Sequence, residues 1–369
     1  MPRLVYNPVV ELSKVSLQGI IALMNYKFFT SSEKAWKAMF NAISQAKKSV
    51  YLEMYIFQPN MTEFDFFHLL REKAREGVKV KIVIDPVGSA DLESGTVFKL
   101  QQVGIEVLFF SYLLHRLHRK VLIVDEKVAF VGGVNLHKNS KLWNDLAVRI
   151  NGGFVKKVTT SFVKSYARAG GKDPILLKRG GKISKSKSNI WVVEHSPVKD
   201  KFYFKRIYKK YLNKANKSII LITPYFLPKR WLSAALHQAV LRGVNVEILV
   251  PKATNHFTAN RTNYFYIYKL SKLGVKFYLE SKMNHAKAMI IDGKESMIGS
   301  QNLDFLSFDF NSEVGIFFKN REVASKLNNI AKEWKKDSVL FDYKTYRPRW
   351  FDYLLLPLIK VFNLFYHLF

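Results

Sequence analysis

Apolar runs and amphipathic stretches alternate along most of the chain. The amphipathic stretch Glu33–Lys47 leads into the apolar run Val50–Phe57, and Phe64–Glu76 leads in the same way into Val78–Ile84. Apolar residues at helical spacing predict helices, and short, nearly continuous apolar runs predict buried strands. Strands that alternate with helices favour an α/β fold, in which helices cover a mixed β-sheet.

The order of these segments recurs in the second part of the chain. Ala46–Leu52 (AKKSVYL) matches Ala215–Leu221 (ANKSIIL), and Glu76–Ile82 (EGVKVKI) matches Arg242–Ile248 (RGVNVEI). The period of about 170 residues is the size of a domain and is too long for a solenoid repeat. We therefore expect two similar α/β halves, each a mixed β-sheet flanked by helices, with one active site at their junction.

The repeat sets the expected domain boundaries. The two halves span 26–165 and 201–340, and a basic linker and loop joins them at 166–200. An N-terminal segment covers 1–25, and an apolar C-terminal tail covers 341–369.

Each half contains one copy of the pattern H-x-K-x4-D, followed by a turn of small residues and an asparagine. A lone His or Lys is usually a structural or solvated residue, but one set repeated in one order at one spacing is hard to obtain from packing alone. In H-x-K the two side chains are two positions apart, so on a strand they point to the same face. We therefore expect both sets to converge in one pocket. The residues are His118, Lys120, Asp125 and Asn135 in the first half, and His285, Lys287, Asp292 and Asn302 in the second.

This set of side chains suits attack on a phosphodiester. A neutral imidazole can attack phosphorus, and a second, protonated imidazole can give its proton to the leaving oxygen. Lysine and asparagine can hold the non-bridging oxygens and stabilise the developing charge. We therefore expect Lys120, Lys287, Asn135 and Asn302 to bind the substrate phosphate. No cluster with metal-ligand spacing is evident in the sequence, so neither a metal nor another cofactor is expected.

Each catalytic histidine is expected to have an acid that orients it. A carboxylate that accepts the other ring N–H fixes the tautomer and stabilises the imidazolium that forms. Asp145 and Glu313 occupy corresponding places in the two halves, shortly after the asparagines. We pair Asp145 with His118 and Glu313 with His285, each within its own half.

The aspartates that end the two motif strands, Asp125 and Asp292, are counted with the histidines and lysines as catalytic residues. Two roles are open for them. Each can hydrogen-bond a histidine, or each can hold the turn that follows the strand.

The chain resembles the phospholipase D superfamily and, within it, the bacterial cardiolipin synthases. The two H-x-K-x4-D motifs carry the resemblance to the superfamily. Three further stretches resemble the synthase branch: Tyr51–Phe57, Thr223–Pro228 and Asn302–Glu313. The similarity runs from about Tyr26 to Trp334, which is most of the chain.

The resemblance implies a phosphatidyltransferase that converts two phosphatidylglycerol molecules into cardiolipin and glycerol through a phosphohistidine intermediate. By the family's usual assignment, His118 is the nucleophile and His285 is the general acid. The sequence departs from the family pattern at Leu306, where an arginine often precedes Ser-Phe. It also departs in that no transmembrane pair precedes the catalytic region.

The charge of the chain bears on its partners. It has 59 Lys and Arg against 29 Asp and Glu, a formal net charge of +30 on 369 residues. Such a field attracts polyanions, either nucleic acid or an anionic membrane surface. The basic run Lys172–Lys187 is interpreted as a mobile loop beside the site or at the membrane surface, or as a solvated linker.

The last twenty residues favour a lipid partner. Trp350–Phe369 is rich in aromatic residues and leucine, but polar residues and a proline interrupt it. This pattern favours an interfacial membrane anchor over a spanning helix. The alternative is a C-terminal helix that packs on the core. Together with the absence of a convincing export signal, the tail predicts membrane association on the cytoplasmic face of a bacterial-type membrane.

Three other functions stay open beside the transferase. They are a lipid hydrolase of the same fold, a nucleic-acid phosphodiesterase, and a non-catalytic membrane-binding protein. Intact motifs in both halves argue against the last, and the apolar tail favours an anionic phospholipid, phosphatidylglycerol, over nucleic acid. Transfer and hydrolysis differ in how well the pocket excludes water, which the sequence does not reveal. It also leaves the oligomeric state unknown.

Overall fold

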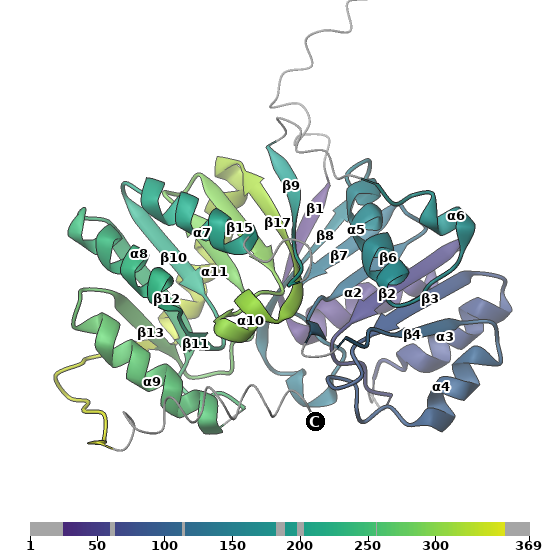
Figure 1. Cartoon of the computed structure of the whole chain (residues 1–369), viewed down its shortest axis with the longest axis horizontal. Helices are drawn as coiled ribbons and strands as arrows, with labels where there is room; N and C mark the ends of the chain where they lie inside the picture. The colour runs from purple at the N-terminus through teal and green to yellow at the C-terminus, as the bar shows by residue number, and fades with distance from the viewer. Residues whose placement is uncertain are drawn as a thin grey trace, which may run out of the picture.

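Two α/β halves lie side by side, each a twisted sheet with helices on its faces (Figure 1). The computed structural model describes residues 25–59, 63–112, 115–181, 189–197, 203–255 and 257–350. Both sheets have the same strand order, with the motif strand next to the first parallel strand. The prediction of two similar α/β halves is therefore confirmed.

The first half is built on a seven-stranded sheet in the order β1-β8-β7-β6-β2-β3-β4. β2, β3 and β4 are parallel, and the other strands are antiparallel to their neighbours. The four segments predicted from the hydrophobic pattern form α2, β2, α3 and β3. The strands are β1 (Tyr26–Ser31), β2 (Ser49–Met54), β3 (Lys79–Ile84), β4 (Glu106–Phe109), β6 (Val121–Val124), β7 (Val128–Gly132) and β8 (Asn144–Asn151). The helices are α2 (Ser32–Ser44), α3 (Phe66–Arg75), α4 (Ser94–Gln101), the short 3-10 helix η1 (Lys138–Ser140), α5 (Val155–Arg168) and α6 (Pro174–Leu177).

The second half repeats this plan as β9-β17-β15-β14-β10-β12-β13, with β18 added beyond β13. The strands are β9 (Ile190–His195), β10 (Ser218–Ile222), β12 (Asn245–Pro251), β13 (Lys276–Glu280), β14 (Ala288–Ile291), β15 (Glu295–Gly299), β17 (Asn311–Lys319) and β18 (Ser338–Leu340). A short parallel pair, β11 (Phe226–Leu227) and β16 (Leu303–Asp304), lies beside it. The helices are α7 (Tyr203–Lys214), α8 (Arg230–Leu241), α9 (Phe257–Ser271), α10 (Phe305–Asp309) and α11 (Arg321–Lys336).

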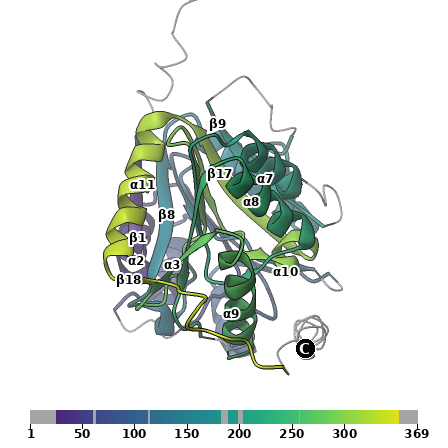
Figure 2. The same cartoon turned by 90° about the vertical axis from the view of Figure 1, so that its left-hand side faces the viewer.

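The core consists of three apolar layers. The outer layers lie under α2, α3 and α4 in the first half and under α7 and α8 in the second. The central layer contains α5, α11 and the facing sides of both sheets, so it is shared between the halves. Figure 2 shows α11 and α8 on opposite sides of β17. Because the central core is common to both halves, the junction between them is a packed interface rather than a hinge.

Two backbone contacts cross the junction and position the site. The two-residue strand β5 (Arg116–Leu117) belongs to the first half in sequence but pairs in parallel with β17 of the second. In the reciprocal place, Asn144 at the start of β8 forms a bridge with Asn284. Each histidine motif is therefore preceded by a segment that is hydrogen-bonded to the other half.

The predicted basic loop and apolar tail are described only in part. The loop interpretation of Lys172–Lys187 is wrong for its start, because Asp173 caps the short helix α6 and Leu176 is buried against α5. Residues 182–188 lie outside the described part of the chain. The predicted anchor also lies outside it, apart from Trp350 at its beginning.

Candidate active site

The imidazole of His118 is held by an acid from the other half. Its Nδ1 lies 2.9 Å from Oε1 of Glu313, and its backbone N–H donates to the carbonyl of Ser312. The prediction that Asp145 pairs with His118 is therefore wrong. The physical reason is the strand pairing of β5 with β17, which places the start of the first motif against the acid-bearing strand of the second half.

The second histidine has the reciprocal arrangement. Nδ1 of His285 lies 2.9 Å from Oδ2 of Asp145, and the backbone N–H of His285 donates to the carbonyl of Asn144. The predicted pair of Glu313 with His285 is thus also wrong, because β8 rather than β17 runs beside the second motif. Both acids were found from the sequence, but their partners are exchanged.

The carboxylate contacts orient both imidazole rings in the same way. Each histidine uses Nδ1 for its carboxylate, so Nε2 is the ring nitrogen that can act on a substrate. His118 is 6% exposed and His285 is 5% exposed, while both carboxylates are buried. A buried carboxylate on Nδ1 fixes one tautomer and favours the imidazolium when it forms.

The two motif lysines are buried close to each other. Nζ of Lys120 donates to the carbonyl of His118, and Nζ of Lys287 donates to that of His285. Burial lowers the pKa of Lys120 well below its usual value, and the charge of Lys287 lowers it further. Burial likewise lowers the pKa of Lys287 to about 7. A bound anion between the two lysines would favour their charged ammonium forms.

The two acids differ in their surroundings. Burial raises the pKa of Glu313, although Lys120 and the hydroxyls of Ser300 and Ser307 act against that rise. The pKa of Asp145 is lowered, because His285 and Lys287 outweigh its burial. His285 itself has a pKa lowered to about 3, first by burial and then by the charge of Lys287. The ring of His285 is therefore neutral at pH 7 in the empty site.

The asparagines lie in the loops that lead away from the motif hairpins. Asn135 accepts a hydrogen bond from the indole N–H of Trp36 through its carbonyl and a long one from the N–H of Ile56 through Oδ1. The N–H of Asn302 donates to Ser307, and its Oδ1 has no hydrogen-bond partner within the described residues. Both are buried. Their assignment to the phosphate stays a prediction.

Asp125 and Asp292 do not contact the histidines. The carboxylate of Asp125 accepts the backbone N–H groups of Lys47, Lys48 and Ser49, at the start of β2. Asp292 does the same for Asn216, Lys217 and Ser218, which lead into β10. Their motif strands separate them from the histidines by about 20 Å of extended chain. They are structural, so counting them as catalytic was wrong. Neither of the two open roles is seen, because each carboxylate holds the segment that leads into the neighbouring strand, β2 or β10, rather than a histidine or the turn after its own strand.

Aromatic residues that carried no predicted role surround the histidines. The ring of Tyr55 meets His118 edge-on at 4.8 Å between centroids, and Nζ of Lys120 lies 4.9 Å from the same ring. Trp143 lies 5.7 Å and Tyr225 lies 6.5 Å from His285. Tyr55 directly follows β2, Tyr225 lies shortly after β10, and each of these strands has a parallel neighbour. The carboxyl ends of such strands usually carry sites, which was the signal available for them.

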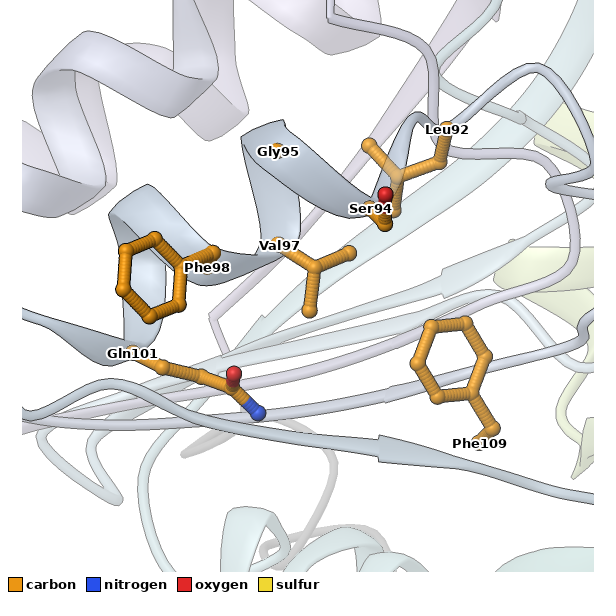
Figure 3. A pocket seen from close by; sticks show the side chains of 7 residues that line it. All are labelled: Leu92, Ser94, Gly95, Val97, Phe98, Gln101 and Phe109. Carbon is orange, nitrogen blue, oxygen red and sulfur yellow. The ribbon is translucent and has the colours of Figure 1, made fainter.

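A separate apolar hollow lies between α4 and β4, with a volume of about 560 Å³. Figure 3 shows Val97 of α4 pointing toward the side that Phe109 of β4 lines, while the ring of Phe98 points the other way. No titratable side chain lines it, so the hollow has no part in acid–base chemistry.

The described residues contain neither a cluster of metal ligands nor a membrane-spanning helix. No group of three or more His, Cys, Asp or Glu side chains in that part of the chain is placed to hold a metal ion. None of its helices combines the length and the apolar character that a membrane crossing requires.

The chain has relatives of known name. It is 28% identical over 340 residues to the probable cardiolipin synthase YwiE of Bacillus subtilis (strain 168), covering 85% of the chain and 66% of that relative. It is 30% identical over 343 residues to the major cardiolipin synthase ClsA of the same organism, covering 87% of the chain and 71% of ClsA. The chain thus spans just under two thirds of the length of YwiE.

A solved structure and a family model complete the comparison. Phosphatidylserine synthase of Haemophilus influenzae Rd KW20 superposes with a TM-score of 0.71 at 15% identity, covering 92% of this chain and 94% of that one, and so shares the fold. The family model described as cardiolipin synthase, PLD-like domain, matches residues 39–166 and 208–334. With one matched segment around each H-x-K-x4-D motif, the chain belongs to the family of cardiolipin synthases with phospholipase D-like domains.

Proposed function

We propose that the protein is a phosphatidyltransferase that makes cardiolipin and glycerol from two phosphatidylglycerol molecules. The observation that carries the proposal is the crossed pair of buried histidine–carboxylate contacts, at 2.9 Å each, beside two buried lysines. One imidazole can attack phosphorus, and the other can exchange a proton with the departing or attacking headgroup oxygen. The lysines hold the non-bridging oxygens.

The reaction is proposed in two displacements at phosphorus. Nε2 of His118 attacks the phosphorus of the first lipid, the bond to the headgroup glycerol breaks, and His285 protonates the departing glycerol oxygen. A headgroup hydroxyl of the second lipid then gives its proton to His285 and attacks the phosphohistidine. The bond from phosphorus to His118 breaks, and cardiolipin is released. Glu313 and Asp145 stabilise the positive charge on their own histidines in turn.

The substrate's charge has a defined role in this scheme. His285 is neutral in the empty site, because burial and Lys287 lower its pKa to about 3. A general acid needs a proton, and the anionic phosphodiester would raise the pKa of the ring beside it. In the absence of that anion, a neutral His285 is the form that suits a nucleophile. The assignment of His118 as nucleophile therefore rests on the family resemblance. It also requires that the bound phosphodiester offset the charge of Lys287, so that His285 can hold the proton of a general acid.

Transfer rather than hydrolysis is supported by the burial of the reacting groups. Both histidines are nearly covered, and Tyr55, Trp143 and Tyr225 contact them. A site that excludes water favours capture of the phosphohistidine by a lipid alcohol over capture by water. The names of the relatives, YwiE and ClsA, agree with transfer.

We also propose that the protein works on the cytoplasmic face of a membrane, with the apolar tail as its interfacial anchor. The net charge of +30 favours an anionic surface. Truncation before Trp350 is expected to release the protein from phosphatidylglycerol vesicles and to leave activity on detergent-dispersed lipid. A truncated protein that still sediments fully with the vesicles would exclude the tail as the anchor.

The function is tested with vesicles of phosphatidylglycerol and mass spectrometry of the products. Cardiolipin and glycerol in equal amounts are expected, with and without EDTA. Phosphatidic acid in place of cardiolipin would assign the hydrolase. Activity that EDTA removes and added metal restores would contradict the mechanism. His118→Asn serves as the inactive control.

A further inference from the structure

Arg116 is a buried cation at the junction, outside the two motifs. It forms β5 with Leu117, its backbone N–H donates to the carbonyl of Phe310 in the other half, and it is 8% exposed. It precedes His118 by two positions. On extended chain that spacing turns both side chains to the same side, about 7 Å apart along the backbone.

The guanidinium of Arg116 acts on a buried acid only at longer range, where burial raises the pKa of Asp85 and the charge of Arg116 acts against that rise. Its Nε has no hydrogen-bond partner, and no carboxylate forms an ion pair with it, within the described residues. Arg119, three residues later, shows the contrast. It is 4% exposed but donates to Glu53 at 3.0 Å and to Ser161 at 2.7 Å.

The nearby acids are already engaged. Asp85 accepts the backbone N–H groups of Val87, Gly88 and Leu117. The carboxylate of Glu313 accepts hydrogen bonds from the ring of His118 and from two serine hydroxyls. Arginine stays charged in proteins, and a buried charge without a partner is strongly unfavourable. An exogenous anion beside the histidines would supply the close ion pair that the described residues do not form with Arg116.

We propose that Arg116 binds the phosphodiester of the second, acceptor lipid while its headgroup hydroxyl attacks at His118. The inference rests on the proposed function, because it assigns each of the two phosphates of cardiolipin to its own binding site. Cardiolipin carries two phosphodiesters joined by one glycerol. One phosphate lies between the histidines and lysines, and the other lies on Arg116, whose planar fork suits a phosphate oxygen pair. Arg116 is thus a specificity residue that selects an acceptor with its own phosphate.

The test compares two soluble headgroups by calorimetry on the full-length protein. Bis(glycerophospho)glycerol, the deacylated headgroup of cardiolipin, offers two phosphates, and glycerophosphoglycerol, that of phosphatidylglycerol, offers one. The wild type is expected to bind the first more tightly by on the order of 10- to 100-fold, the scale of a hydrogen bond to a charged group. In Arg116→Gln this preference should vanish while binding of the one-phosphate headgroup stays within a few-fold. Arg116→Lys should restore part of the preference.

The control variant is Arg75→Gln, which removes one charge from the exposed face of α3 and should keep the full preference. Inorganic phosphate provides a second arm. If it binds as tightly as the two-phosphate headgroup and loses that binding in Arg116→Gln, the site takes free phosphate, and the proposal is overturned. Equal loss of both headgroups in Arg116→Gln would also overturn it, because Arg116 would then serve the transferred phosphate.

Two measurements separate this proposal from its alternatives. A melting temperature of Arg116→Gln at or above that of the wild type is expected, because an unpaired buried charge is removed. A fall of several degrees would show a structural role and overturn the proposal. The binding preference needs no turnover. If vesicles give no cardiolipin but the preference and its loss are observed, the proposed function fails and the second anion site stands.

Discussion

Glu313 and His118 are 195 residues apart in sequence and belong to different halves, yet the carboxylate holds the imidazole at 2.9 Å. Asp145 and His285 form the same contact in the opposite direction. Neither half therefore contains a complete histidine–carboxylate pair. The shared apolar core and the site depend on each other, because the β5–β17 contact that joins the halves also aligns the first pair.

The crossed pairing predicts which histidine each acid controls. Glu313→Gln should change the ¹⁵N chemical shifts of the His118 ring and leave those of His285 unchanged, and Asp145→Asn should do the opposite. Each variant should lower kcat by on the order of 10²- to 10⁴-fold, because the histidine loses its tautomer and the partner of its imidazolium. Shifts of His285 in Glu313→Gln would contradict the pairing. Glu322→Gln, on the exposed surface of α11, serves as the control.

The identity of the nucleophile is a separate prediction. A rapid quench with phosphatidylglycerol labelled at phosphorus is expected to place the phosphate on His118, because the family resemblance assigns attack to the first motif. His285→Asn should accumulate less of this intermediate, since the departing glycerol oxygen then lacks its proton donor. Peptide mapping that finds the label on His285 would reverse the two roles. The measurement is informative because the low pKa of His285 leaves its ring neutral in the empty site, and a neutral imidazole is the form that attacks phosphorus.

The sequence revealed the histidines and acids that meet at the junction, but not the way in which the halves exchange them. Both ways of pairing the acids preserve the internal repeat, so the sequence pattern is the same for either. The choice depends on β5, a two-residue strand with no hydrophobic pattern of its own, and on its pairing with a strand far along the chain. Repeated local patterns predicted α2, β2, α3 and β3 well, because those elements depend on nearby residues.

Other features depended on contacts that no local pattern contains. Asp125 looked catalytic because it closes the motif. Its carboxylate instead accepts hydrogen bonds from the backbone N–H groups of Lys47 to Ser49, which only the pairing of β2 with β6 brings near. Arg116 and Arg119 read alike in the sequence. Only the fold shows that one has a carboxylate partner and the other does not.

The lysines are predicted to act on the transition state. Lys120→Ala or Lys287→Ala should lower kcat by on the order of 10²-fold or more, the scale of one lost oxyanion donor. Because burial disfavours the ammonium form of both lysines, either variant should fold with unchanged or higher stability in the absence of phosphate. Steady-state kinetics and thermal unfolding check both statements. A variant with full kcat would exclude its lysine from the phosphate site.

The two motif aspartates are predicted to serve stability rather than chemistry. Asp125→Ala and Asp292→Ala should each lower the free energy of unfolding by about 1–3 kcal/mol, because three backbone N–H groups lose a common acceptor. The two effects should add, since the residues lie in different sheets. In the folded fraction kcat should stay within a few-fold of the wild type. A variant that keeps its stability but loses activity would restore the catalytic role.

The stabilisation by these aspartates should also depend on pH. Burial alone would raise the pKa of Asp125, but hydrogen bonds from Ser49, Lys48 and Lys47 outweigh burial and lower it, and Asp292 behaves alike. A pKa lower in the folded state than in the unfolded state adds stability above the ordinary value of 3.8, and this stability is lost as the pH falls through the folded pKa. Urea unfolding should therefore show a large difference between the wild type and Asp125→Ala at pH 7 and a smaller one near pH 3. A difference that stays constant across this range would mean that the ionised carboxylate is not what holds the start of β2.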